Sequence, residues 1–396
     1  MSAQPRPIEG GVTAPQGFVA GAMACGIKPS GKPDLALVAS RTTAAVAGVF
    51  TTNRVKAAPV ILSQQRAAAG RARAVIVNSG NANACTGEEG QRAAERMAAA
   101  TARRLDLAAD EVLVLSTGVI GVPLPVEKIE AALPALVPSP DGGDAAAQAI
   151  MTTDTRPKTA AVEVAIDCST VRIGGMAKGA GMIHPNMATM LAVITTDAAI
   201  APADLQRHLG AAARHSFNRI DVDGDTSTND SVVLLANGAS GTTLPGELFA
   251  EALTQVCVSL ARQIAADGEG ATKLLEVTVT GAARLEDAEK AARAITRSTL
   301  VKAAMYGNDP NWGRILCAAG YSGAVFDPTG ARLVVQGIPL FAHGVPLPFD
   351  AQAASAALRA PEVAVHLDLG SGDQSATAWG CDLSPEYVRF NAEYTT

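Results

Sequence analysis

Short apolar runs that end at glycine, proline, asparagine or aspartate recur along the chain, and they constrain its fold more than any other feature. Runs of about four to eight residues, rich in β-branched side chains, are typical of buried strands. Such runs lie at 36–40, 44–51, 72–80, 110–118, 162–167, 190–198, 230–238 and 275–281. Alanine-rich helical patterns lie between several of them, at 88–105, 125–137, 202–217 and 245–267. Strands interleaved with helices predict a layered α/β architecture.

The order of these elements favours a mixed sheet. Several early strands follow each other directly, whereas parallel neighbours need a long crossover between them. Near residue 281 a charged helical pattern, a Gly/Asn/Pro loop and further strands begin again. A chain of 396 residues is long enough for more than one domain. We therefore expect a main α/β domain over 1–280, a layered mixed-sheet sandwich with helices, and a smaller C-terminal α/β domain over 281–396.

Composition and charge argue against several classes of protein. Apolar residues make up 48% of the chain and charged residues 18%, which fits a folded protein and argues against disorder. The formal net charge is −6 and no basic stripe appears, so we expect no nucleic-acid partner. No apolar run reaches the roughly 18 residues of a membrane helix, and the first residues lack the apolar core of a secretory signal. The six cysteines are scattered without metal-ligand spacing, so we expect a reduced, cytoplasmic protein with no metal and no membrane partner.

Two loops have the residue types of known ligand motifs but the wrong pattern. GIKPSGK at 26–32 has phosphate-loop spacing, yet Pro33 occupies the position of the magnesium-binding hydroxyl. DVDGDTSTND at 221–230 alternates carboxylates, but Gly224 is its fourth residue rather than its sixth, and Val232 stands where a calcium loop has glutamate. The sequence therefore predicts no cofactor.

Three loops near apolar runs are rich in polar side chains. They are VNSGNANACTG at 77–87, STGVIG at 116–121 and MTTDT at 151–155. Taken singly, such Asn, Ser, Thr and Gly clusters are ordinary turn material. Together they predict a site of hydroxyl and backbone N–H groups, which suits a developing oxyanion.

One threonine, Thr189, lies where a glycine-containing loop meets an apolar run, in KGAGMIHPNMATMLAVITTDA at 178–198. A lone buried threonine usually just bonds a backbone carbonyl. At a chain N-terminus, however, threonine can act without histidine, because its α-amino group, with a pKa of about 7.7–8.0, serves as the base. To create that amine the Thr189 hydroxyl must attack the Ala188 carbonyl, the acyl group must shift from N to O, and water must cleave the ester. We expect Gly179 and Gly181 to supply the backbone bend. The residues alone leave both interpretations open.

Many long motifs in one order make the chain resemble the glutamate N-acetyltransferase/ornithine acetyltransferase family of arginine biosynthesis. They include KGAGMIHPNMATML, GVFTTNRVKAAPV, VNSGNANACTG, STGVIG, IMTTDT, DGDTSTNDS, GEGATK, DPNWGRI and the ending AWGCDLSPEYVRFNAEYTT. The resemblance implies a proenzyme that cuts itself between Ala188 and Thr189. The α chain (1–188) and the β chain (from 189) then stay together, commonly as α2β2. The implied fold is ornithine acetyltransferase/aminopeptidase-like.

The resemblance also implies roles for individual residues. Thr189 takes acetyl from N-acetylornithine, releases ornithine and gives the acetyl group to glutamate, while Thr117 and Gly118 form the oxyanion hole. Six residues match the family's substrate-binding positions: Thr152, Lys178, Thr189, Glu269, Asn391 and Thr396. Whether acetyl-CoA also serves as donor is left open. The alternatives are an N-terminal-threonine amidohydrolase or aminopeptidase, in which water collects the acyl group, and an uncut binding or scaffold protein.

Overall fold

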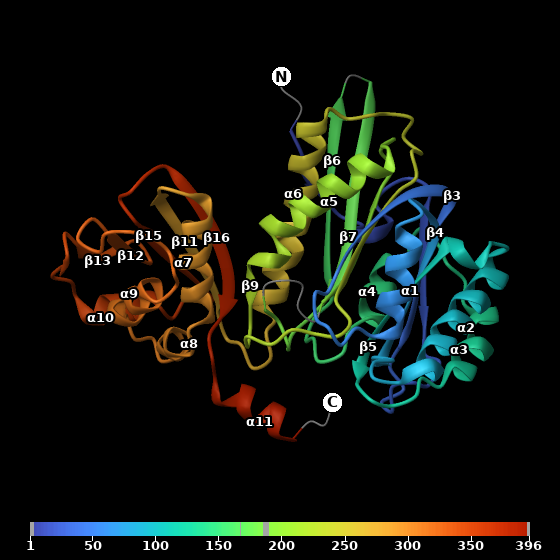
Figure 1. Cartoon of the computed structure of the whole chain (residues 1–396), viewed down its shortest axis with the longest axis horizontal. Coiled ribbons are helices and arrows are strands. Elements are labelled where there is room, and N and C mark those ends of the chain that lie inside the picture. The colour runs from blue at the N-terminus through green and yellow to red at the C-terminus, as the bar shows by residue number, and fades with distance from the viewer. Residues whose placement is uncertain (1–3, 167, 185–189, 394–396) are drawn as a thin grey trace.

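The computed structural model describes residues 4–166, 168–184 and 190–393. Its strands form two mixed sheets, each with helices packed on it, and a narrow junction joins the two parts (Figure 1). The predicted α/β class with mixed sheets is confirmed. Within the described ranges, no helix is both long and apolar enough to cross a membrane.

The first sheet contains nine strands within the described residues, in the order β1-β6-β7-β8-β10-β3-β4-β5, with β2 paired to β3. Its strands are β1 (Arg6–Ile8), β2 (Phe18–Met23), β3 (Leu35–Phe50), β4 (Arg71–Asn81), β5 (Val112–Val119), β6 (Lys158–Ile166), β7 (Ser169–Lys178), β8 (Leu191–Thr196) and β10 (Ser231–Ala236). The pairs β8–β10 and β4–β5 are parallel, and the other neighbouring pairs are antiparallel. Two strands from beyond residue 190, β8 and β10, thus lie between strands from before residue 179.

Both faces of this sheet are covered, which explains why its strands read as continuous apolar runs. Val232 and Leu234 of β10 pack against α5 and α6, whereas Val233 and Leu235 point to the opposite face and pack in the cluster that contains α4. The helices around the sheet are α1 (Ala58–Ala67), α2 (Gly87–Leu105), α3 (Val126–Ala132), α4 (Gly143–Ala149), α5 (Pro202–His215) and α6 (Gly246–Ala266), with short 3-10 turns η1 (Gly11–Thr13), η2 (Ala109–Glu111), η3 (Leu133–Ala135) and η4 (Phe217–Arg219).

The second sheet contains seven strands within the described residues, in the order β14-β13-β12-β15-β11-β16-β9. They are β9 (Ile220–Asp221), β11 (Leu274–Ala282), β12 (Arg332–Val335), β13 (Ile338–Ala342), β14 (Val345–Pro346), β15 (Glu362–Asp368) and β16 (Gln374–Cys381). Its helices are α7 (Leu285–Arg297), α8 (Thr299–Tyr306), α9 (Trp312–Gly320) and α10 (Ala351–Ala357). The expected division at residues 280–281 falls within β11, and β9 comes from the part of the chain before it. The division into two domains stays a prediction.

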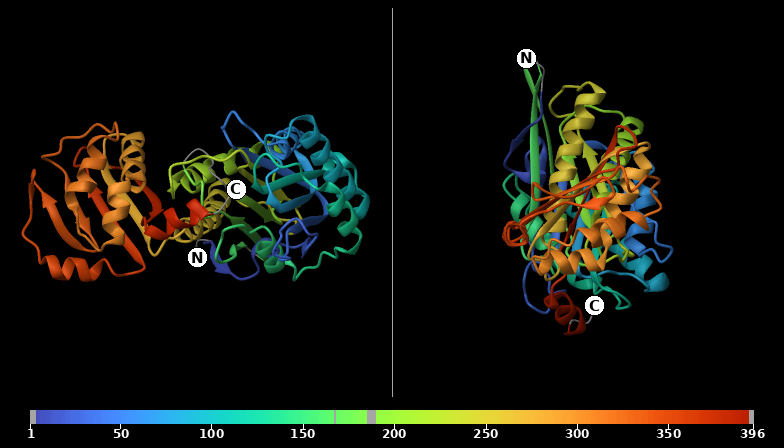
Figure 2. Two further views of the ribbon diagram at one scale, coloured as in Figure 1. Left: turned by 90° about the horizontal axis from the view of Figure 1, so that it is seen from below. Right: turned by 90° about the vertical axis from the view of Figure 1, so that its left-hand side faces the viewer.

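The last helix, α11 (Pro385–Glu393), leaves the second sheet and returns toward the first. Two further views show it lying at the junction of the two parts (Figure 2). A Cβ atom on Gly270, whose φ is +70°, would lie 2.6 Å from the Tyr387 backbone nitrogen, so α11 packs closely on the loop after α6. This helix brings the C-terminal end of the described chain to the pocket described next.

Candidate active site

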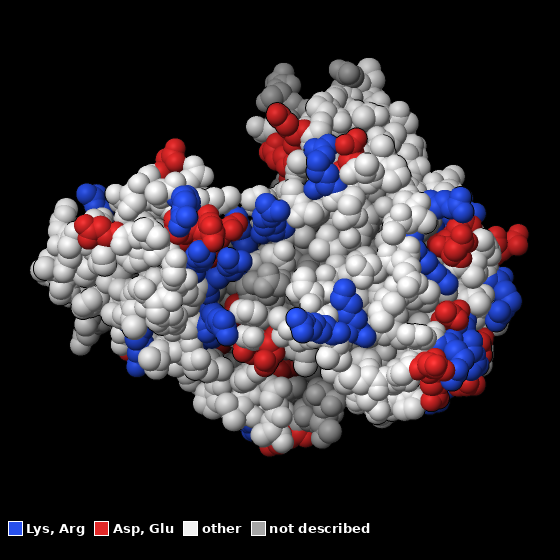
Figure 3. Space-filling view, in the orientation of Figure 1, with Lys and Arg blue, Asp and Glu red and all other residues white. Residues whose placement is uncertain are grey.

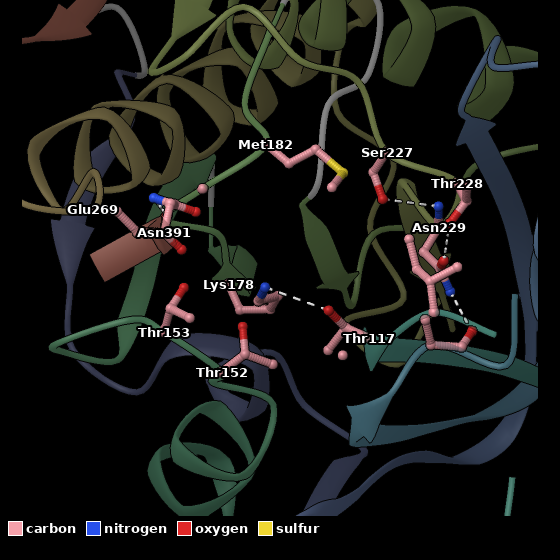
Figure 4. A pocket seen from close by; sticks show the side chains of 14 residues that line it. Thr117, Thr152, Thr153, Lys178, Met182, Ser227, Thr228, Asn229, Glu269 and Asn391 are labelled. Carbon is pink, nitrogen blue, oxygen red and sulfur yellow. Dashed lines mark hydrogen bonds between the residues drawn. The ribbon is translucent and has the colours of Figure 1, made fainter. Parts of the chain in front are cut away.

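A pocket of about 680 Å³, including its part open to solvent, lies at the carboxyl ends of β5 and β7. The labelled side chains surround an open centre in Figure 4. Six of the predicted site residues line it: Thr117, Gly118, Thr152, Lys178, Glu269 and Asn391. The other lining residues are Ala82, Ile120, Thr153, Gly181, Met182, Ser227, Thr228 and Asn229. The predicted residues Ala188, Thr189 and Thr396 lie outside the described residues. The structure brings the six together, and the chemical roles of all nine stay predictions.

Gly118 is a position that only glycine can occupy. Its φ is +136°, and a Cβ atom there would lie 2.3 Å from the Gly80 carbonyl carbon and 2.4 Å from the Asn81 nitrogen. The end of β4 lies directly against β5 at this point, where the register of the pair is irregular. The two backbones can approach each other this closely because residue 118 has no side chain.

Thr117 precedes it and is almost fully buried, with 3% of its surface exposed. The Lys178 ammonium donates to its hydroxyl at 3.4 Å, and the two side chains point toward each other across the floor of the pocket (Figure 4). A hydroxyl held by a cation at this distance can turn its own proton toward a ligand oxygen, because the cation occupies one of its lone pairs.

The asparagines of the 77–87 loop do not point into this pocket. Asn78 and Asn81 bind backbone carbonyls of their own loop and of the β5–α3 connection, and the Ser116 hydroxyl donates to Asn78 at 2.5 Å. Asn229, which does line the pocket, donates to the carbonyls of Ala82 and Ser116 at 2.7 and 2.8 Å. These hydrogen bonds hold the ends of β4 and β5 side by side. The loop therefore supports the shape of the pocket, and its asparagine side chains do not line it.

Lys178 is a buried cation, 2% exposed, at the last position of β7. Burial lowers its pKa, and the carboxylates of Asp154 (4.0 Å away) and Glu269 oppose that effect. Burial by itself also raises the pKa of Asp154, but Lys178 and Lys158 together bring it down to about 2. Asp154 is therefore an anion at neutral pH and favours the charged form of Lys178.

Beneath the pocket, a buried network of charges holds the 152–155 loop. The Lys158 ammonium lies 2.6 Å from Asp154 and 2.6 Å from Asp267, and its side chain is fully buried. Asp154 also accepts from the backbone N–H groups of Thr152 (2.9 Å) and Gly179 (2.7 Å). The network thereby joins the loop that carries Thr152 to the strand end that carries Lys178.

Replacing Lys158 with methionine should destabilise the protein strongly. Two buried carboxylates would lose their cation, and breaking a buried ion pair from one side costs about 3–5 kcal/mol. Chemical denaturation measures the loss of unfolding free energy. The exposed Lys32, changed to methionine, is the matched control and should stay within roughly 0.5 kcal/mol of wild type. Equal losses in the two variants would show that the network contributes nothing specific.

The turn that leaves β7 is bound by one carboxylate from the 221–230 stretch. Asp223 accepts from the backbone N–H groups of Met182 at 2.6 Å and Ile183 at 2.9 Å, and burial raises its pKa to about 6. Met182, with φ +56°, takes a left-handed conformation in this turn. A Cβ atom on Gly181 would lie 2.4 Å from the Glu269 carboxyl carbon, so a larger residue there would displace that carboxylate.

A second carboxylate from the same stretch binds the backbone at residue 190. Asp230 accepts from the backbone N–H of Met190 at 2.8 Å, and its fully buried carboxyl has a pKa raised by burial well above its usual range. The rejected calcium loop thus anchors the backbone on both sides of residues 185–189. Sequence reasoning missed this role, although the acidic spacing of DVDGDTSTND marked the stretch as unusual.

Glu269 and Asn391 form the wall opposite Thr117. Asn391, on α11, donates to the Glu269 carboxylate at 2.9 Å, and the Glu269 backbone N–H donates to the carbonyl of Ala180 at 2.9 Å. The pocket therefore has a buried cation in its floor, an anion in its wall and threonine and serine hydroxyls elsewhere in its lining. Such a site suits a ligand that carries a carboxylate and an ammonium group. Among the described residues, no cluster of three or more His, Cys, Asp or Glu side chains could hold a metal ion.

Two comparisons with known sequences identify the same family. The model of the ArgJ family matches residues 19–396. The arginine biosynthesis bifunctional protein ArgJ of Symbiobacterium thermophilum is 54% identical over 399 residues, with 98% of this chain and 99% of the relative covered. The protein of the same name from Thermus thermophilus is 54% identical and covers 97% of this chain and 100% of its own. A solved structure of ornithine acetyltransferase complexed with ornithine, from Mycobacterium tuberculosis, is 47% identical, with a TM-score of 0.43, and covers 46% of this chain and 98% of the solved chain.

Proposed function

The chain belongs to the ArgJ family and is an acyltransferase of arginine biosynthesis, and from this premise we propose that it carries acetyl from N-acetyl-L-ornithine to L-glutamate on Thr189. The proposal includes self-cleavage between Ala188 and Thr189, a cytoplasmic location, and α and β chains that stay together as α2β2. It leaves open whether acetyl-CoA is also a donor.

The observation that carries the proposal is the strand register at the start of β8. Leu191 pairs with Lys178 of β7 on one side and with Ser231 of β10 on the other. The residue two positions before Leu191 cannot be more than about 7 Å along the chain from it. This short reach from a strand that pairs with Lys178 supports the proposal that Thr189 acts at the pocket floor, where Lys178 and Thr117 meet. A nucleophile at this position would have both the cation and the hydroxyl within its reach.

In the proposed transfer, the free amine of Thr189 accepts the proton of its own hydroxyl as the oxygen attacks the acetyl carbonyl of N-acetylornithine. Negative charge develops on the acetyl oxygen, and the Thr117 hydroxyl and the Gly118 N–H donate to it. The bond from the acetyl carbon to nitrogen breaks, ornithine leaves with the proton, and an acetyl ester remains on Thr189. The amine of glutamate then attacks that ester in the reverse sense and restores the hydroxyl.

The charges of the pocket support amino-acid substrates. Lys178 is suited to the α-carboxylate that both substrates carry, and Glu269 to the ammonium of the ornithine side chain. Each charge is costly to bury without a partner, so a bound amino acid stabilises the site as well as filling it. Thr152 and Asn391 add neutral donors and acceptors beside them.

Steady-state kinetics test the order of events. One nucleophile that passes acetyl between two amino acids predicts parallel double-reciprocal plots and an acetyl-Thr189 adduct detectable by mass spectrometry. The isolated acetyl-enzyme should lose its acetyl group much faster with glutamate than without it. Intersecting plots with no trapped adduct would contradict the mechanism, and equal loss without glutamate would favour the amidohydrolase alternative.

A further inference from the structure

Asp230 is a buried acid directly before β10 that the transfer mechanism above does not use. Its Oδ1 atom accepts from the backbone N–H of Met190, and its Oδ2 atom has no hydrogen-bond partner among the described residues. The Lys, Arg, Asp and Glu side chains coloured in Figure 3 lie at the surface in mixed groups, where water solvates their charges. Asp230 has no such contact with water, because 0% of its surface is exposed. A buried polar atom without a partner is rare and points to a function.

The surroundings of Asp230 fix the backbone of Met190, the residue that follows Thr189. The Met190 N–H donates to Asp230 Oδ1 at 2.8 Å, and the Met190 carbonyl accepts from the backbone N–H of Ser231 at 3.2 Å. Asp230 is itself held, since its own carbonyl accepts from the backbone N–H of Thr51 at 3.0 Å. Two consecutive residues, Asp230 and Ser231, therefore bind both polar backbone groups of Met190.

Covalent geometry limits the distance from this carboxyl group to the bond that self-cleavage would break. The Thr189 nitrogen and hydroxyl oxygen belong to the residue bonded to Met190, so neither atom can be more than about 5 Å from the Met190 nitrogen. The Asp230 carboxyl oxygen lies 2.8 Å from that same nitrogen. This short reach supports a role for Asp230 at the two atoms between which a proton must move.

The environment of Asp230 favours its neutral, protonated form. Burial removes the water that would stabilise a carboxylate and raises the pKa of Asp230 well above its usual range. The Lys178 ammonium opposes this effect, but that cation also faces two other carboxylates in the pocket. The nearby Thr51 hydroxyl donates its proton to the carbonyl of Ser227 at 2.9 Å. Asp230 therefore carries a proton at neutral pH, close to the start of β8.

Self-cleavage needs a proton donor that the later transfer reaction does not need. An amide nitrogen is a poor leaving group until it gains a proton, and a positioned acid supplies that proton in the transition state. Before the cut, the Thr189 nitrogen is part of a peptide bond and cannot act as the base. A group other than the α-amine must therefore move the proton.

We propose that Asp230 is the acid of self-cleavage, which gives its proton to the Thr189 nitrogen as the bond from that nitrogen to the Ala188 carbonyl carbon breaks. The Thr189 hydroxyl oxygen bonds to the same carbon and loses its proton to the carboxylate left on Asp230. One C–O bond forms, one C–N bond breaks, and one proton passes from oxygen to nitrogen through a carboxyl group that ends as it began. This role rests on the proposed self-cleavage and adds the source of its proton.

Asp230→Asn tests this role, because asparagine keeps the size of the side chain and the oxygen that accepts from Met190 but has no acidic proton. The full chain is made by cell-free synthesis, and the fraction cut between residues 188 and 189 is followed with time by mass spectrometry. We expect Asp230→Asn to be cut at least 100-fold more slowly than wild type, since a positioned acid contributes roughly 10²–10⁴ in rate.

Asp197→Asn is the matched control. Asp197 is also fully buried, directly after β8, and its two oxygens accept from the backbone N–H groups of Gln16 at 2.9 Å and Arg172 at 2.8 Å. Asparagine at this position loses one of the two bonds, whereas Asp230→Asn keeps the one bond that its side chain accepts. Asp197→Asn should therefore lower the melting temperature more than Asp230→Asn does, and it should still be cut like wild type.

Two further measurements separate proton transfer from a structural role. Asp230→Glu keeps an acid but adds a methylene group to a packed site, so it should melt at a lower temperature than Asp230→Asn and still be cut faster. A structural role predicts the reverse order of cutting. Hydroxylamine, which cleaves esters, should speed the release of fragments from wild type but not from Asp230→Asn, because little ester forms without the acid.

The outcomes distinguish failure of this role from failure of the proposed function. Cutting of Asp230→Asn at the wild-type rate would overturn the role of Asp230 and leave the proposed function intact. Rapid release of its fragments by hydroxylamine would show that the ester forms without the acid, and would overturn the role in the same way. Wild type that stays uncut would contradict the proposed self-cleavage, and the role of Asp230 with it.

Discussion

Thr189→Ala should purify as one uncut 396-residue chain with no acetyl transfer. The alanine has no oxygen to attack the Ala188 carbonyl, so the N-to-O shift cannot begin and no α-amine is released. The same change removes the group that would carry the acetyl ester. Wild type should give two fragments, 1–188 and 189–396, by mass spectrometry without any added protease, apart from loss of Met1.

Two further variants make this test specific. Thr189→Ser keeps the hydroxyl and should still be cut, at a lower rate. Thr43→Ala, which alters an exposed threonine of β3, should be cut and should transfer acetyl like wild type. A wild type that is fully intact yet active would show that the amine is not the base. Wild type that stays intact and inactive would favour the binding or scaffold alternative.

Thr117→Ala should lower kcat by about 10²–10³ with little change in KM. Loss of one oxyanion donor typically costs roughly 2.7–4 kcal/mol of transition-state stabilisation, and the bond forms mainly when charge develops on the acetyl oxygen. The position fits this role, because Thr117 is buried next to Gly118 and its hydroxyl accepts from the Lys178 ammonium at 3.4 Å. Thr117→Ser, which keeps the hydroxyl, should lose far less.

The measurement must separate catalysis from stability. If the Thr117 hydroxyl only makes a structural hydrogen bond at the end of β5, its loss would lower the free energy of unfolding by about 1 kcal/mol and leave turnover near wild type. The kcat and melting temperature are therefore measured on the same matured sample. An unchanged kcat with a lowered melting temperature would refute the oxyanion assignment.

Helices with a clear periodicity could be predicted from the sequence. The patterns at 88–105, 202–217 and 245–267 correspond to α2, α5 and α6 with ends that differ by at most two residues. Local features define their starts, such as Pro202 in the first turn of α5. Continuous apolar runs likewise marked β4, β5, β8 and β10, since strands covered on both faces need no alternation.

Strand β7 was missed because contacts distant in sequence determine it. Adjacent glycines such as Gly174 and Gly175 are typical of a turn. In the structure, a Cβ atom on Gly174 would lie 1.9 Å from the carbonyl oxygen of Gly11, which packs against the strand. That contact joins residues more than 160 positions apart. The two-residue β9 was too short to leave any pattern.

The site was predictable only in part for the same reason. The residues themselves indicated polar strand ends and an unusual threonine, and the resemblance assigned the roles. The buried network depends on Lys158 meeting Asp267, which lies 109 positions away. Asp223 looked like part of a failed ion loop, whereas it binds backbone N–H groups 40 and 41 positions earlier. Neither interaction could be predicted from a local stretch of sequence, because the partners lie far apart along the chain.

The placement of β8 and β10 between β7 and β3 has a consequence for how the protein must be made. In one chain, these two strands enter the gap by loop closure, whose entropic cost grows only slowly with loop length. From two separate chains, the same insertion would depend on collision and on an open gap that exposes unpaired strand edges on both sides. Folding of the whole chain should therefore precede the proposed cut. After such a cut, the interleaved sheet would keep the halves together, so under this proposal the peptide bond between residues 188 and 189 would be needed for assembly and not for the assembled state.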